Sequence, residues 1–343
     1  MEITKLLALG VEYKASDLHL SSGVAPLFRV NGDIRKVNVE PLSDEIVRKM
    51  IYDIMPDSIK KVYERDLEAD FSFEVPGLAR FRVNAFVQNR GASAVFRTIP
   101  SKILTLDQLN CPPLFAKLME KQKGIILVTG PTGSGKSTTL AAMIDHYNTH
   151  EKGHILTVED PIEFVHESKL SLVNQREVGP MTRSFNAALK SALREDPDLI
   201  LVGEMRDLET IRLALTAAET GHLVLGTLHS SSSSKTINRI IDVFPENEKE
   251  MVRTMLSESI EAIISQSLLK TKDGSSRVAA HEIMVGTPAI RNLIRENKIA
   301  QMYSSIQTGQ ALGMQTMDQC LKKMVAEGKV SQTTAQLYSV HGL

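Results

Sequence analysis

The sequence predicts an α/β protein in which an N-terminal α+β domain precedes a larger domain built on a parallel, helix-covered sheet. Three observations support this class. Short strands with hairpin turns recur over residues 1–98, strands and helices alternate over residues 125–227, and a glycine-rich loop at residues 130–138 joins a strand to a helix. The length of 343 residues accommodates two domains of ordinary size.

Composition excludes several classes of protein. Hydrophobic residues make up 42% of the chain and charged residues 24%, and the net charge of −1 provides no basic field for nucleic acid. Apolar runs such as 125–128 and Leu199–Val202 are too short to cross a bilayer. The N-terminal residues lack the pattern of a signal peptide, and Cys111 and Cys320 form no CxxC pair. We therefore expect a cytoplasmic protein that neither inserts into a membrane nor binds nucleic acid.

Residues 1–98 are predicted to form the first domain, with an amphipathic helix over residues 3–14 and a second helix over residues 43–55. Ser43 begins the second helix in a pattern that resembles a capping box. The sequence Asn31-Gly32-Asp33 predicts a hairpin turn. Strands are predicted at residues 15–21, 27–30 and 34–37, and the strands predicted at 70–75, 79–86 and 92–98 are expected to form one sheet.

Residues 99–113 contain Pro100, Pro112 and Pro113, which predict a linker with one short helix at residues 106–109. Residues 114–343 form the second predicted domain. Its strands are expected at residues 125–129, 155–159, 199–202 and 223–227, and its helices at 137–147, 183–194 and 208–218. This alternation implies a parallel sheet with helices on both faces. The remaining expected elements are helices at 235–241 and 247–265, a strand pair near 266–269 and 277–284, and helices from about residue 287.

The glycine-rich loop matches G-x-x-x-x-G-K-[ST] at every fixed position and lies between a strand and a helix, as that motif requires. Its glycines allow backbone N–H groups to turn toward a phosphate, and the N-terminus of the next helix adds a positive dipole end. Lys136 can reach the β- and γ-phosphates of a nucleotide, and the Ser137 hydroxyl can hold Mg²⁺. The predicted phosphate-binding residues are Gly130, Pro131, Thr132, Gly133, Ser134, Gly135, Lys136, Ser137 and Thr138.

Three stretches at strand ends supply acids and a histidine that nucleotide hydrolysis could use. Glu159, Asp160 and Glu163 follow one strand, and each is a candidate for activating water. Glu204 follows a strand after a glycine that stands where an aspartate is usual, so Glu204 is expected to hold the metal through water. His229 lies just past another strand, where it could sense the γ-phosphate.

Together these motifs resemble the secretion ATPases of type II secretion and type IV pilus systems. The matching stretches are residues 130–137 with the Walker A motif, 159–163 with the Asp box, 199–204 with the atypical Walker B motif and 222–229 with the His box. Residues 15–19 resemble a signature of the N-terminal domain of this family. Residues 289–296 resemble the C-terminal motif of its pilus retraction branch, and two distant cysteines cannot build the four-cysteine zinc site of the assembly ATPases.

The resemblance implies a PAS-like N-terminal domain, a RecA-like ATPase domain and a homohexameric ring that uses ATP and Mg²⁺. Arginines cluster in the first domain; solvated strand faces are one explanation of the cluster. In a ring, however, arginines of one subunit could meet the γ-phosphate held by its neighbour. Arg82 and Arg97 are the predicted arginine fingers, with Arg194 and Arg206 as alternatives. Among the three acids, Glu163 is the predicted base.

The resemblance further implies a motor for pilus retraction and twitching motility, recruited to the inner face of the inner membrane by a platform protein. A paralogous accessory retraction ATPase is an additional partner to consider. Hydrolysis would change the angle between the domains across residues 99–113. An extension or type II secretion ATPase, a RecA-like nucleic-acid translocase and a nucleotide switch without turnover stay open as alternatives. Balanced charge and the Asp and His boxes disfavour the translocase.

The stretch at 289–296 is predicted to form a helix with Thr287 as its N-cap and Pro288 as its first residue. Its apolar residues are expected to face the core. Arg291, Arg295 and Glu296 are expected to project elsewhere. Replacing both arginines should therefore leave folding nearly normal and disturb only a partner contact.

Overall fold

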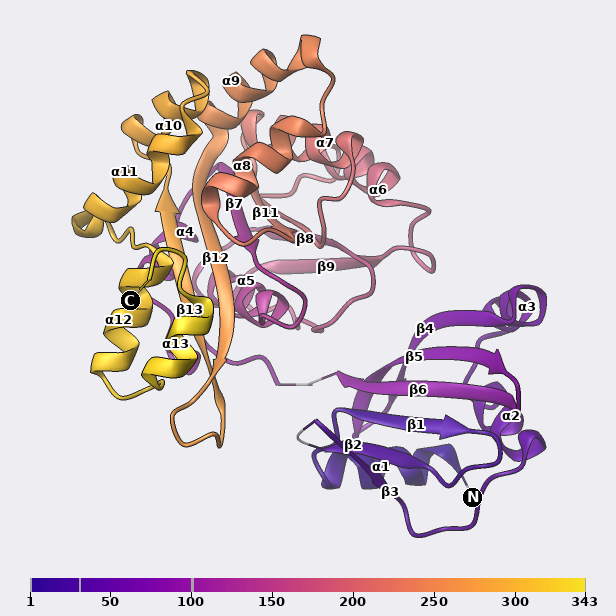
Figure 1. The fold of residues 1–343 in the computed structure, drawn as a ribbon. Helices are drawn as coiled ribbons and strands as arrows, with labels where there is room; N and C mark the ends of the chain where they lie inside the picture. The colour runs from indigo at the N-terminus through magenta and orange to yellow at the C-terminus, as the bar shows by residue number, and fades with distance from the viewer. Residues whose placement is uncertain (1, 31, 100–101, 343) are drawn as a thin grey trace. The chain divides into compact units, whose positions relative to one another are not determined.

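The computed structural model describes residues 2–30, 32–99 and 102–342. The chain divides into two compact units after Lys102, and each is considered by itself (Figure 1). Asn31 of the predicted hairpin turn and Pro100 of the predicted linker lie outside the described residues. Among the residues that are described, no helix is long and apolar enough to cross a membrane.

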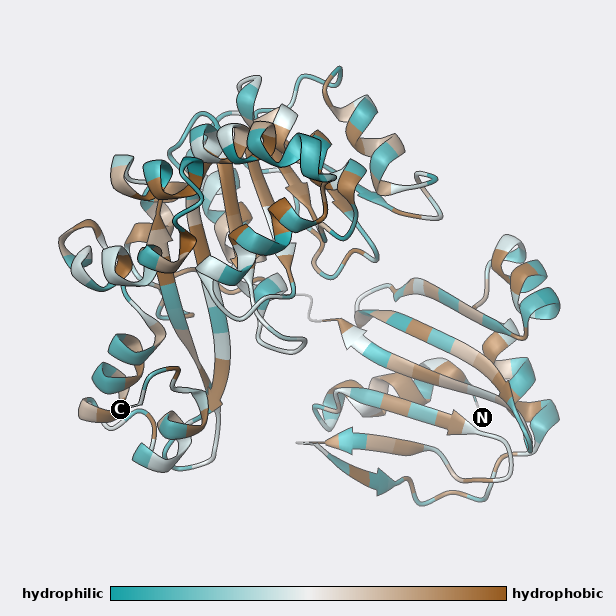
Figure 2. Ribbon diagram, turned by 45° about the horizontal axis from the view of Figure 1, so that its top comes forward, coloured by the Kyte–Doolittle hydropathy of each residue, from teal (hydrophilic) through white to brown (hydrophobic). Residues whose placement is uncertain are grey.

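The first unit is a six-stranded antiparallel sheet with the order β3-β2-β1-β6-β5-β4. Its strands are β1 (Asp17–Ser21), β2 (Leu27–Val30), β3 (Asp33–Lys36), β4 (Glu68–Val75), β5 (Ala79–Gln88) and β6 (Gly91–Ile99). Three helices share one core with the sheet: α1 (Ile3–Glu12), α2 (Asp44–Tyr52) and α3 (Asp57–Asp66). Buried and partly exposed residues alternate along β5, which is the pattern of a sheet with one covered face. Hydrophilic and hydrophobic residues alternate along strands of this unit (Figure 2).

The second unit is a seven-stranded sheet with the order β13-β12-β7-β11-β10-β8-β9, parallel except where β12 meets β13. Its strands are β7 (Gly124–Thr129), β8 (His154–Glu159), β9 (Leu172–Glu177), β10 (Leu199–Val202), β11 (Leu223–Leu228), β12 (Ile260–Lys270) and β13 (Arg277–Val285). The central strands are apolar on both faces (Figure 2). On β7, Ile125 and Leu127 enter one core while Ile126 and Val128 enter another.

Helices cover both faces of this sheet. The helices are α4 (Leu114–Leu118), α5 (Lys136–His150), α6 (Phe185–Ala192), α7 (Leu208–Glu219), α8 (Ser233–Asp242), α9 (Lys249–Ser259), α10 (Pro288–Arg295), α11 (Met302–Thr308), α12 (Met317–Ala326) and α13 (Gln332–Tyr338). α4 and α5 pack on one face, whereas α6 to α10 pack on the other. The predicted α/β class, with an α+β domain before a parallel sheet and helices toward the C-terminus, is therefore confirmed.

The predicted helix over residues 247–265 is wrong in its second half. α9 ends at Ser259, and the chain continues as β12. Ile263 and Ile264 are both fully buried, because β12 lies between β7 and β13 and helices cover each side. A continuously buried strand shows no alternation, so its apolar run could not be told from a buried helix. The short helix predicted at residues 106–109 is also wrong, since this stretch forms turns.

Arg291 was predicted to project away from the core, so that its replacement would leave folding nearly normal, and the structure instead gives it partners within the second unit. Thr287 caps α10 and Pro288 begins it, as predicted. Arg291, however, is 22% exposed and pairs with Glu261, with its Nη2 2.6 Å from Oε1. Its guanidinium also donates to the carbonyls of Ser257 and Gly286, at 3.0 and 2.7 Å. Arg291 therefore joins α10 to the end of α9 and the start of β12.

Candidate nucleotide-binding site

The phosphate loop leaves β7 and ends at the first turn of α5, as the motif requires. Gly135 is the residue before the helix and has φ 86°, a left-handed conformation that glycine adopts without strain. Among the described residues, no side chain caps this helix. The N–H groups of the first turn of α5 are therefore available to an anion at this terminus.

Two side chains of the loop are placed to contact the phosphates of a nucleoside triphosphate. The Lys136 ammonium donates to the carbonyls of Gly130 and Pro131, at 2.9 and 3.1 Å, so it is folded over the loop. Burial lowers the pKa of Lys136, while the charges of Glu204 and Glu163 oppose this shift. The hydroxyl of Ser134 is buried and makes no hydrogen bond within the part of the chain that the structure describes. A buried cation and an unpaired hydroxyl beside an uncapped helix form a site suited to phosphate oxygens.

The strand order brings the predicted acids and histidine to one edge of the sheet. β7, β11, β10 and β8 are parallel neighbours, so their carboxyl ends lie together. Glu204 follows β10 and His229 follows β11, and His229 Nε2 lies 3.3 Å from Glu204 Oε1. The structure therefore joins the predicted metal-site acid to the predicted phosphate sensor.

Glu204 has a second partner in Arg206, whose Nη2 lies 2.6 Å from Oε2. Burial alone would raise the pKa of Glu204. The hydrogen bond and charge of Arg206, with the charges of His229 and Lys136, instead hold the pKa of this carboxyl below its usual range. Glu204 is therefore an anion at neutral pH, as a group that holds a hydrated cation must be.

The glycine before Glu204 is explained by close packing. A Cβ at Gly203 would lie 3.1 Å from the carbonyl oxygen of Val158 and 3.2 Å from the Cα of Glu159. An aspartate at this position would require the neighbouring strand to shift. The first acid that this strand can present is therefore Glu204.

The three candidate bases differ in their surroundings. Glu159 accepts hydrogen bonds from the Thr157 hydroxyl at 2.6 Å and the Gln175 amide at 3.2 Å. Burial of its carboxyl raises the pKa of Glu159. Asp160 and Glu163 are exposed. Glu163 lies close enough to Lys136 for its negative charge to oppose the lowering of the Lys136 pKa. Glu159 is thus engaged within the fold, whereas Glu163 faces solvent beside the phosphate loop.

Arg82 and Arg97 face each other across β5 and β6 in the first unit, whereas the phosphate loop belongs to the second. Arg97 also binds Asp17, with Nε 3.0 Å from Oδ1. Of the alternatives, Arg194 is exposed after α6, and Arg206 is paired with Glu204 as described above.

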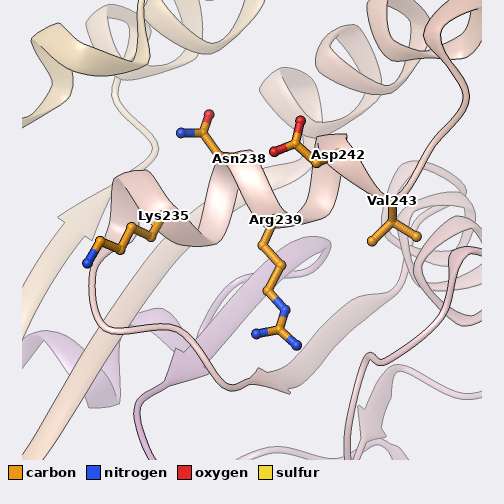
Figure 3. A pocket seen from close by; sticks show the side chains of 5 residues that line it. All are labelled: Lys235, Asn238, Arg239, Asp242 and Val243. Atoms are coloured by element: carbon orange, nitrogen blue, oxygen red, sulfur yellow. The ribbon is translucent and has the colours of Figure 1, made fainter.

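Several residues around the site were missed by motif reasoning. Gln175 supports the loop after β8 by donating to the carbonyl of Phe164 at 2.8 Å. Arg239 extends from α8 beside a hollow of about 460 Å³ and donates to the carbonyl of His229 at 2.6 Å (Figure 3). Gln266 of β12 contacts the phosphate loop itself. Gln175 and Arg239 lie 11 and 10 residues from the carbonyls that they contact, and Gln266 lies 132 residues from Ser134, so none of them falls inside a recognised motif.

Comparison with known proteins places this site in a family. The sequence matches the family described as Type II/IV secretion system protein over residues 2–339, and the chain belongs to this family. It is 66% identical over 336 residues to the type IV pilus retraction ATPase PilT of Pseudomonas aeruginosa, covering 98% of this chain and 97% of that protein.

Two further comparisons refine this result. The type IV pilus ATPase PilU of the same organism is 39% identical over 335 residues, covering 98% of this chain and 88% of that protein. A solved structure of the pilus retraction motor PilT with bound ADP has a TM-score of 0.93 and 46% identity, covering 99% of this chain and 97% of that chain. The chain is thus more similar to PilT than to PilU of this organism.

Proposed function

We propose that this protein is a Mg²⁺-dependent ATPase motor that drives retraction of a type IV pilus and thereby twitching motility. The protein is an ATP-hydrolysing enzyme of the secretion ATPase family. The observation that carries the proposal is the convergence of the phosphate loop, Glu204 and His229 at one sheet edge, in a chain 66% identical to a retraction ATPase.

ATP would be held by the loop from Gly130 to Thr138. The N–H groups of the first turn of α5 and the Lys136 ammonium would bind the phosphates, after Lys136 exchanges its two carbonyl partners for phosphate oxygens. Mg²⁺ would neutralise charge on the phosphates, with Ser137 and, through water, Glu204 as its protein ligands. No cluster of three or more histidine, cysteine, aspartate or glutamate side chains that could hold a metal occurs among the described residues.

Glu163 is the proposed base for the attacking water. It is exposed beside Lys136, whereas Glu159 is engaged by two hydrogen bonds. A general base needs an accessible carboxylate within reach of the water that it activates. Asp160, which is also exposed, is the alternative. His229 would report the γ-phosphate to Glu204 through the contact between them.

The working form of the motor is proposed to be a homohexameric ring at the inner face of the inner membrane, acting on a pilus platform protein. Arg82 and Arg97 of one subunit would meet the phosphate bound by its neighbour, as arginine fingers do. Residues 1–98 and 114–343 would move as separate domains about residues 99–113 during hydrolysis. A paralogous ATPase could assist retraction, and the greater similarity to PilT favours the main motor for this chain.

The proposal can be tested in cells that carry pili. The chromosomal gene would be replaced by the wild type, by Lys136→Ala or by Lys152→Ala, which removes an exposed lysine after α5. Surface pili would be counted by electron microscopy. If the protein is a retraction motor, Lys136→Ala cells should accumulate pili and stop twitching, whereas Lys152→Ala cells should behave as wild type. Loss of pili in the Lys136→Ala cells would indicate an extension motor instead.

A further inference from the structure

Gln266 contacts the phosphate loop from a strand that carries none of the recognised motifs. It lies on β12 and is 3% exposed. Its Nε2 donates to the carbonyl of Ser134 at 2.6 Å, and its Oε1 accepts from the hydroxyl of Thr139 at 2.8 Å. Ser134 belongs to the loop and Thr139 to the first turn of α5. One planar amide therefore fastens the loop and the helix to the same strand.

The orientation of this amide is fixed by its neighbours. His281 of β13 places Nε2 3.1 Å from Gln266 Oε1, and an amide oxygen can only accept, so this imidazole nitrogen carries the proton. Burial lowers the pKa of His281 to about 4, which keeps the ring neutral at neutral pH. The Ser134 carbonyl can only accept, so a flipped amide would set its oxygen against that carbonyl oxygen.

The backbone of the loop is shaped to admit Gln266. A Cβ at Gly130 would lie 2.3 Å from the Gln266 carbonyl oxygen, and a Cβ at Gly135 would lie 2.9 Å from Gln266 Nε2. Any other residue at Gly130 would push the loop away from β12. Two glycines of the motif thus serve the approach of Gln266 as well as the approach of a phosphate.

We propose that Gln266 is a positioning residue, which holds Ser134 and Thr139 so that the loop is shaped for phosphate before nucleotide arrives. The proposal rests on the proposed binding of ATP at the loop. Gln266 contacts Ser134 and Thr139, so its proposed action is through the loop. Without it, the loop must be ordered during binding, and ordering costs affinity. The Ser134 carbonyl would also lose its partner.

The test uses the full-length protein and a fluorescent ADP analogue as the probe. Gln266→Leu keeps the approximate size of the side chain but removes its hydrogen bonds. We expect about tenfold weaker ADP binding and a raised KM for ATP, with a smaller change in kcat. Thr139→Val should weaken binding severalfold, while Thr139→Ser, which keeps the hydroxyl, should restore it.

Thr149→Val is the matched control, because Thr149 is exposed near the C-terminal end of α5, where its hydroxyl bonds the Asp145 carbonyl and the Lys169 ammonium rather than the phosphate loop. Circular dichroism melting would identify variants that fold. Wild-type affinity and KM in folded Gln266→Leu would overturn the proposal. If that variant does not fold, equal affinities of Thr139→Val and Thr139→Ser would overturn it. Lys136→Ala separates the two proposals: if it binds ADP as wild type does, the proposed nucleotide site is wrong.

Discussion

Arg291→Ala should destabilise the second unit strongly, although the sequence places Arg291 in a helix that resembles an interaction motif. The side chain donates to carbonyls in the last turn of α9 and pairs with the Glu261 carboxylate. Removing it takes the donor from these carbonyls and a cation from a helix C-terminus, while Glu261 keeps Lys121 as an ion-pair partner, with Nζ 3.1 Å from Oε2. Because Arg291 is 22% exposed, water replaces part of this interaction. We expect a loss of about 2–3 kcal/mol, at or below the lower end of the range of about 3–5 kcal/mol for breaking a fully buried ion pair.

The assay is urea unfolding of the full-length protein. The quantity compared between variants is the urea midpoint at which the second unit unfolds. Arg295→Ala is the matched control: Arg295 is exposed on the same helix, so its loss should change stability by less than about 0.5 kcal/mol. Arg291→Lys should fall between the two, because lysine keeps the charge but not the fork of donors. Equal unfolding midpoints for Arg291→Ala and Arg295→Ala would refute the reasoning. Arg295→Ala is also the variant that tests a partner contact, since its effect on twitching would not arise from instability.

Three further predictions concern the nucleotide site. Lys136→Ala should weaken ADP binding about 100-fold in a calorimetric titration, because a charge facing the phosphates is lost, while Lys152→Ala binds normally. Glu163→Gln and Glu204→Ala should bind ATP but lose about 100-fold or more in steady-state turnover; normal hydrolysis by Glu163→Gln would move the base to another acid. Arg82→Ala protein mixed with Lys136→Ala protein should recover ATPase activity if the arginine acts between subunits, and mixed rings without any recovery would contradict that role.

Local chemistry made the phosphate loop and most strands predictable. The glycines, lysine and hydroxyl of the loop have fixed spacing, and Thr287-Pro288 gave the start of α10 correctly. Glu204 and His229 were each placed just past a strand, and in the structure these two strand ends bring His229 Nε2 to 3.3 Å from Glu204 Oε1.

Features that depend on distant neighbours were not predictable. Ile263 and Ile264 belong to a strand only because β7 and β13 flank it. β9 was missed, since its residues are mostly half-buried at the edge of the sheet and carry no apolar run. The partners of Arg291 were missed because helical spacing gives no information on α9 and β12, which supply them. The role inferred for Gln266 depends in the same way on a loop about 130 residues earlier in the chain.

The central claim is that ATP hydrolysis at this site drives pilus retraction, and single-cell imaging of labelled pili tests it most directly. Cells would carry the wild type, Glu163→Gln or Glu167→Gln, the last of which changes an exposed glutamate in the same segment. The account predicts that pili still extend in Glu163→Gln cells but that retraction events become rare, with normal retraction in Glu167→Gln cells. Retraction at wild-type frequency in Glu163→Gln cells, when the purified variant lacks ATPase activity, would contradict it.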